Sequence, residues 1–176
     1  MAITAAVRSQ PLPAPFVTAA RRVDVLTEAV ITVETDEGIS GCCGAPDTAA
    51  VTGDTPGSAV YAAEHIFAPL LVGRELTADV SECCEKALYG NPGAKAALDV
   101  AVHRALAASR GVPLCALLGG RPHELTTDLT ISAGAPSDVA SRAADAYANG
   151  FPILKIKLGT DIEADLQTLR ELKAAL

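Results

Sequence analysis

Two lysines, Lys155 and Lys157, stand two residues apart in the apolar segment 151–158 (FPILKIKL). The segment predicts a β-strand, and side chains two apart on a strand point to the same face. Both ammonium groups therefore share one face, and Leu154 and Ile156 belong to the other. Because a parallel strand flanked by helices is buried on both faces, we expect the two cations to lie in a shared interior.

Two neighbouring ammonium groups suit the removal of a proton from the carbon next to a carboxylate. A lysine with a depressed pKa can act as a general base, and a second cation favours that depression and can bind the carboxylate. The resulting enediolate carries two oxyanionic oxygens, which a divalent metal would stabilise. Two alternatives stay open. A Schiff-base lysine leaves the second lysine unexplained, and an edge strand with a solvated polar face needs no chemistry.

The lysines belong to an alternation of strands and helices that begins near residue 126. Apolar periodicity predicts strands over 126–134 and 151–158, and helices over 137–148 and 161–176. Thr160 and Glu163 have capping-box spacing at the start of the last helix. Short links between such elements imply a parallel sheet. Active sites of barrels lie at the carboxyl ends of the strands, and the lysines lie near that end.

The preceding residues predict an α+β organisation. Alternation predicts a half-buried strand over 23–33 and a hairpin return over 39–44, after the turn Asp36-Glu37-Gly38. Apolar stripes predict helices over 80–88 and from Asn91, the N-cap, to Gly111, the stop. A short strand over 1–8 precedes the stretch with Pro11, Pro13 and Pro15, which predicts a loop because proline lacks an amide proton.

Composition excludes several classes of protein. With 14 Lys and Arg against 21 Asp and Glu, the net charge is -7, and no basic footprint for nucleic acid is visible. No apolar run has the length of a membrane span, and the N-terminus does not have the pattern of a signal peptide. We expect a cytoplasmic protein without a nucleic-acid or membrane partner.

The five cysteines are Cys42, Cys43, Cys83, Cys84 and Cys115. Adjacent pairs do not have the spacing of a zinc site or of a redox C-x-x-C motif, and an odd number argues against a disulfide framework. We interpret them as buried, reduced thiols.

Four segments resemble the muconate-lactonising branch of the enolase superfamily. GFPILKIKLG (150–159) resembles its K-x-K strand, and residues 91–120 resemble the helix and Gly-Gly bend that lead from capping domain to barrel. Residues 45–55 (APDTAAVTGDT) and 15–22 (PFVTAARR) are similar to the dipeptide epimerases, which invert L-Ala-D/L-Glu and related dipeptides. The resemblance runs through the whole chain.

This resemblance implies an α+β capping domain over residues 1–125, followed over 126–176 by the first two β/α units of a (β/α) barrel, a truncated TIM-type barrel. The implied activity is that of a Mg2+-dependent dipeptide epimerase, an isomerase with a small dipeptide as its substrate. A homo-oligomer is expected for a full-length member of the family.

The resemblance also assigns roles to individual residues. Lys157 would be one of two acid/base lysines that flank the substrate α-carbon, and Lys155 would lie beside it and contact the substrate carboxylate. Thr130, in the first barrel strand, matches a substrate-contacting threonine. Arg21 matches the arginine that pairs with a glutamate side chain in Ala-Glu epimerases, a pairing suited to bidentate geometry. A solvated loop arginine beside Arg22 is the alternative for Arg21.

The chain departs from the family pattern in two places. The family commonly has G-x-G-E-A-P after the first hairpin, where this chain has GCCGAP, with Cys43 for a glycine and Gly44 for the glutamate. The acidic Mg2+ ligands, the second acid/base lysine and the C-terminal specificity motif are expected beyond Leu176. We therefore expect no metal ligand within these residues and no activity from the chain alone.

Three alternatives share the same sequence features. A muconate or chloromuconate cycloisomerase and an o-succinylbenzoate synthase use the same scaffold, but Arg21 and the TGDT stretch favour the epimerase. The third is a non-catalytic module for binding or assembly, because two strands cannot close a barrel and leave open edges. In-frame coding DNA beyond codon 176 would favour the enzyme.

Overall fold

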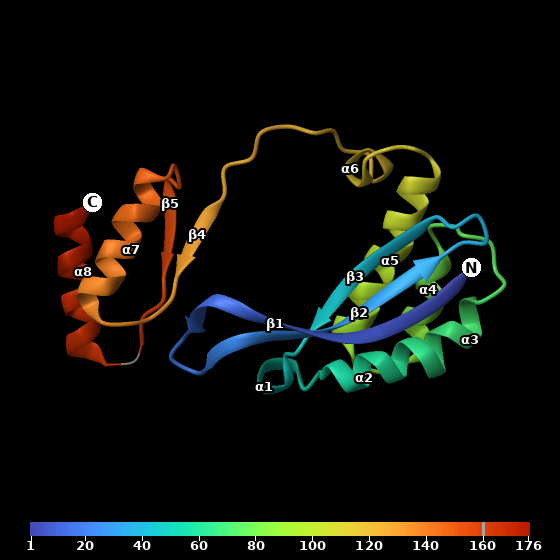
Figure 1. The fold of residues 1–176 in the computed structure, drawn as a ribbon, viewed down its shortest axis with the longest axis horizontal. Coiled ribbons are helices and arrows are strands. Elements are labelled where there is room, and N and C mark those ends of the chain that lie inside the picture. Colours follow the sequence, from blue (N-terminus) through green and yellow to red (C-terminus); the bar gives the residue numbers. More distant parts are fainter. Residues whose placement is uncertain (160) are drawn as a thin grey trace. The chain divides into compact units, whose positions relative to one another are not determined.

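A computed structural model of the chain describes residues 1–159 and 161–176, without the side chains of Val80 and Ser81. It divides into two compact units, shown in Figure 1. The first contains Met1–Gln10 and Leu26–Pro122, and the second contains Pro11–Val25 and His123–Leu176.

The N-terminal hairpin and its returning strand form one sheet. Its strands, in the order β1-β2-β3, are β1 (Ala2–Val17), β2 (Arg22–Glu34) and β3 (Ser40–Pro46). The turn between β2 and β3 has Gly38 at φ 76°, and its N–H donates to the carbonyl of Thr35 at 3.1 Å. The predicted antiparallel hairpin is confirmed, with Ile31 opposite Cys43.

The predicted loop at the prolines is wrong, because β1 continues through them to Val17. Pro11, Pro13 and Pro15 stand at alternate positions of a strand that lies at the edge of the sheet order. Alternate amide groups of an edge strand point away from the ladder, so a proline there removes no ladder hydrogen bond. The regular spacing of the three prolines therefore suits the strand.

Helices fill the rest of the first unit. They are α1 (Ala49–Thr52), α2 (Pro56–Tyr61), the π-helical η1 (Ala62–Phe67), α3 (Ala68–Leu71), α4 (Val80–Ala87), α5 (Pro92–Ser109) and α6 (Leu114–Leu117). The two helices expected at 80–88 and after Asn91 are confirmed, and Gly111 follows α5 at φ 62°. Asn91 is in the N-cap position with φ 53°, but its side chain does not cap and donates instead to the carbonyl of Ser58 at 3.0 Å.

The core of the first unit lies where α5 packs on β3 (Figure 1). Small side chains permit close approach, and a Cβ at Gly41 would meet the main chain of Ala101 and Ala105. The apolar stripe predicted for α5 is buried throughout: Ala94, Ala97, Leu98, Ala101, Val102, Ala105 and Leu106. Burial of this stripe supplies the apolar area that stabilises the unit.

The cysteines are free thiols, as expected, but their predicted burial is wrong for most of them. Cys84 is buried in the core, whereas Cys42, Cys83 and Cys115 are exposed and Cys43 is intermediate. Because α4 buries only a narrow stripe, Cys83 faces outward, and its sulfur accepts a hydrogen bond from Arg74 at 3.4 Å.

The second unit contains the alternation of strands and helices. It has β4 (Asp128–Ile131), α7 (Pro136–Ala148), β5 (Ile153–Ile156) and α8 (Ile162–Ala175), and β4 pairs with β5 in parallel. All four predicted elements and the parallel pairing are confirmed. Asp161 caps α8 by accepting from the N–H of Ala164 at 3.0 Å, while the expected capping residue Thr160 lies outside the described residues. Among the described helices, none has the length and apolar character to cross a membrane.

Candidate functional site

The register of β4 and β5 brings two of the expected site residues together. Thr130 is the direct partner of Lys155 in the parallel ladder. The neighbouring rungs, Leu129 with Leu154 and Ile131 with Ile156, belong to the apolar cluster with α7 and α8. Because alternate side chains point to opposite faces, Thr130 and Lys155 share the sheet face that turns away from these helices.

The two lysines have different surroundings. Lys155 is exposed, so the expected burial of both strand faces is wrong for this chain. Helices α7 and α8 cover one face of the sheet formed by β4 and β5. Among the described residues, no further strand covers the opposite face, on which Lys155 lies. Lys157 is half-buried, and its Nζ lies 5.9 Å from the ring centroid of Phe16, within the range of a cation–π contact.

A turn at the tip of the β1–β2 hairpin carries Arg21. The N–H of Thr18 donates to the carbonyl of Arg21 at 2.9 Å, and the Thr18 hydroxyl accepts from the N–H of Arg21 at 3.2 Å. Arg22 is engaged by Asp24, with Nη2 2.8 Å from Oδ1, and this hydrogen bond and charge raise the pKa of Arg22. The guanidinium of half-buried Arg21 makes no hydrogen bond or ion pair to any described residue, which leaves it available for an anion.

The hairpin tip also bounds a cavity in the second unit. The cavity has a volume of about 750 Å3. Its lining comes from the tip, from β4 and from α7, and includes Phe16, Thr130, Ser132, Arg142, Asn149 and Phe151. Phe16 thus borders the cavity and also contacts Lys157, so the cavity and the candidate base have one side chain in common.

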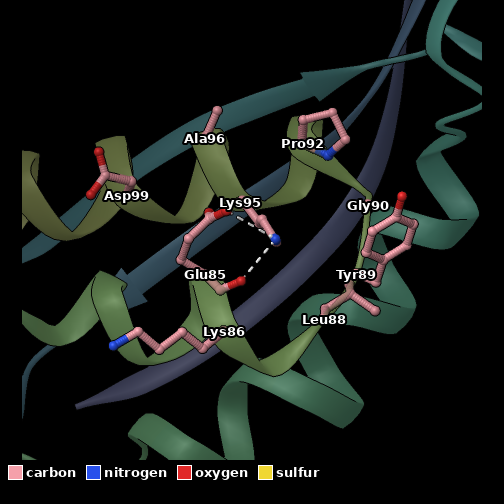
Figure 2. A pocket seen from close by; sticks show the side chains of 9 residues that line it. All are labelled: Glu85, Lys86, Leu88, Tyr89, Gly90, Pro92, Lys95, Ala96 and Asp99. Atoms are coloured by element: carbon pink, nitrogen blue, oxygen red, sulfur yellow. Dashed lines mark hydrogen bonds and ion pairs between the residues drawn. The ribbon is translucent and has the colours of Figure 1, made fainter.

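A second cavity, between α4 and α5, has no sign of chemistry (Figure 2). Its lysine, Lys95, is bound to Glu85 through the carboxylate at 3.2 Å and the carbonyl at 2.9 Å. Asp99 also lines this cavity, and its Oδ1 lies 3.3 Å from Nδ1 of half-buried His103, four residues further along α5. The contact of Lys95 with Glu85 is an ion pair at the helix surface that joins α5 to α4.

The described residues do not fit a metal site. Among them, no group of three His, Cys, Asp or Glu side chains could hold a metal ion. We therefore assign no step of chemistry to Mg2+ on these residues.

Comparison with known proteins identifies the family. Residues 2–119 match the family described as mandelate racemase / muconate lactonizing enzyme, N-terminal domain. The chain belongs to this family. The L-Ala-D/L-Glu epimerase of Clostridium acetobutylicum is 34% identical over 170 residues, which are 96% of this chain and 48% of the relative.

Solved structures of this family agree with the fold. A substrate-liganded complex of the L-Ala-D/L-Glu epimerase from Bacillus subtilis matches with a TM-score of 0.91 and 34% identity, over 98% of this chain and 49% of that one. The dipeptide epimerase from Enterococcus faecalis V583, complexed with Mg and L-Leu-L-Tyr, matches with a TM-score of 0.88 and 29% identity, over 100% of this chain and 51% of that one. The chain thus spans about half the length of the family members it matches. The expected capping domain followed by β/α units is confirmed.

Sequence reasoning overlooked two residues near the lysines. Phe16 belongs to the segment 15–22, and no sequence signal links it to Lys157, which is 141 positions further along the chain. Ser132 could have been found, because it lies two residues beyond Thr130 and alternation assigns both to one strand face.

Proposed function

We propose that this chain supplies the capping domain and the first two β/α units of a dipeptide epimerase. Lys157 removes or returns the proton on the α-carbon of the substrate's second residue, and Lys155 and Thr130 bind the adjacent carboxylate. Arg21 pairs with an acidic side chain of the substrate, which favours L-Ala-D/L-Glu among dipeptides. The acidic Mg2+ ligands and the second acid/base lysine belong to the half of the enzyme outside these residues.

One observation carries this proposal: the direct pairing of Thr130 with Lys155 on the face away from α7 and α8. A hydroxyl and an ammonium on neighbouring strands can both donate to one carboxylate, and a charge-assisted pair of this kind is strong. The unpaired guanidinium of Arg21 supplies the second cationic site that a dipeptide with a glutamate residue requires.

The proposal can be tested in a chimera that joins residues 1–176 to the remaining half of the Bacillus subtilis epimerase. In D2O, proton NMR should show loss of the Glu α-proton signal of L-Ala-L-Glu. Lys157→Ala should lower the exchange rate by at least about 100-fold, because general acid–base catalysis contributes on that scale.

The exposed Lys173 on α8 provides the matched control, and Lys173→Ala should leave exchange unchanged. A chimera with a cooperative unfolding transition but no exchange would contradict the proposal. Conversion of muconate without any dipeptide exchange would favour the cycloisomerase.

A further inference from the structure

Ser132 is a buried polar residue at the carboxyl end of β4. It is 9% exposed, although it follows the last residue of the strand, Ile131. It lies two residues beyond Thr130, so alternation gives the two hydroxyls the same sheet face. Both residues also line the cavity under the hairpin tip.

The strand ladder brings Ser132 beside Lys157. Thr130 pairs with Lys155 and Ile131 with Ile156. The N–H of Lys157 then donates to the carbonyl of Ile131 at 3.1 Å, which continues the parallel ladder by one step. Continued in this register, Ser132 lies opposite Lys157, just beyond the last pair of the ladder, on segments about 4.8 Å apart. The register therefore gives Thr130 and Ser132 on one strand the opposing residues Lys155 and Lys157 on the other.

The main chain around Ser132 is fixed on both sides. Arg142 donates from Nη2 to the carbonyl of Ser132 at 2.8 Å and from Nε to the carbonyl of Asp138 at 3.3 Å. The N–H of Ala133 donates to the carbonyl of Val17 in the hairpin tip at 3.1 Å. A side chain on this backbone is held in place before any ligand arrives.

The hydroxyl of Ser132 itself makes no hydrogen bond to any described residue. The Ser132 oxygen is not fully enclosed, because Asn91 Oδ1 is the one fully buried side-chain atom without a partner among the described residues. The Ser132 hydroxyl can therefore reach a ligand, and a preorganised donor beside a reacting centre is well placed to stabilise negative charge there. Because the hydroxyl stays neutral across the physiological pH range, it can donate to a carboxylate without competing with Lys157 for protons.

We propose that Ser132 is a further substrate-binding residue, which donates a hydrogen bond to the carboxylate next to the carbon on which Lys157 acts. This inference rests on the proposed function. In it, Thr130 and Lys155 hold the carboxylate from one rung and Ser132 from the next, nearer the carboxyl ends of the strands.

Titration of the isotope-labelled 176-residue chain with L-Ala-L-Glu, followed by NMR, tests this role. We expect shifts at Ser132 and its neighbours, and about tenfold weaker binding by Ser132→Ala, the scale of a lost hydrogen bond to a charged group. Ser132→Thr keeps a hydroxyl and should bind like the wild type. If Ser132→Ala does not fold, Ser132→Cys, with its weak donor, should show the same loss.

The same dipeptide with its α-carboxylate converted to an amide is the matched ligand. It should bind the wild type and Ser132→Ala alike, because the charged acceptor is gone. Equal affinity of wild type and Ser132→Ala for L-Ala-L-Glu would overturn the inference, and so would a wild-type chain that does not bind it. Weaker binding by Lys155→Ala but not by Ser132→Ala would reject the role of Ser132 and leave the proposed function standing.

Discussion

At the scale of single residues, the position of the candidate base Lys157 depends on the side chains around it. Lys157 follows β5, two residues beyond Lys155, and its Nζ lies 5.9 Å from the centroid of the Phe16 ring in the hairpin tip. An aromatic face attracts an ammonium by about 0.5–1 kcal/mol at an exposed site. That is enough to favour one position of a flexible side chain without fixing it.

We expect Phe16→Leu to release the ammonium group of Lys157. In the chain with 13C-methylated lysines, the Lys157 methyl signal should lose its ring-current shift, and Phe16→Tyr should retain it. Phe151→Leu removes another ring from the same cavity and is the control that should leave the signal in place. An unchanged signal in Phe16→Leu would rule out the contact.

Cys84 gives a pH dependence of stability. Burial, with a smaller contribution from the neighbouring Cys83 charge, raises the pKa of its thiol from 9.0 to about 11. The folded state favours the neutral thiol, so this contribution is complete below pH 9.0 and is lost as the pH rises towards about 11. Between these values Tm should fall more steeply for the wild type than for Cys84→Ala. Replacement of the exposed Cys83 by alanine should keep most of the wild-type slope, because burial is the larger cause of the shift in the pKa of Cys84. Equal slopes in all three proteins would refute the assignment.

At the scale of elements, the β2–β3 pair explains the departure at Gly44. Val30 is opposite Gly44 and Glu28 is opposite Pro46, so Glu28 is a diagonal neighbour of Gly44 on one sheet face. The space that a Cβ at Gly44 would occupy is taken by the Glu28 carboxylate. A carboxylate thus lies at this place in the sheet, but it comes from the adjacent strand.

Gly44→Glu should destabilise the chain by under about 1 kcal/mol, because the Glu28 carboxylate is the end of a flexible side chain and can shift, but two like charges then lie close together on one sheet face. Combined with Glu28→Ala, the same substitution should cost much less, because the competing carboxylate is gone. Urea unfolding of the two single variants and the double variant gives the coupling energy. Additive effects would show that the two positions are independent.

Local sequence patterns predicted most elements but not all of their limits. The apolar periodicity of β2, α5, β4 and α7 was sufficient to predict these elements, because each of them buries one face. The helical stretch from Pro56 to Leu71 was missed, although Thr55 and Ser58 form a capping box before it, a signal that the sequence contains. The exposure of Lys155 was not predicted, because the burial of this strand face depends on the strands opposite it and not on its own segment.

At the scale of the whole molecule, the site is partial. The described residues provide candidate acid/base and anion-binding groups, but no cluster that could hold a metal ion. We expect the 176-residue chain alone to give no Mg2+-dependent exchange of the Glu α-proton of L-Ala-L-Glu in D2O. Proton NMR with the Bacillus subtilis epimerase as the positive control checks this, and exchange above the buffer rate would mean that these residues form a complete centre.

The two strands of the N-terminal hairpin each pass from one unit to the other, since β1 changes unit after Gln10 and β2 after Val25. Cutting the chain once, between Pro122 and His123, would therefore leave the second unit without its residues 11–25, which would stay attached to the first unit. To separate the second unit, the chain must be cut at three peptide bonds, before Pro11, after Val25 and after Pro122. Alternatively, a designed fragment must join residues 11–25 to residues 123–176.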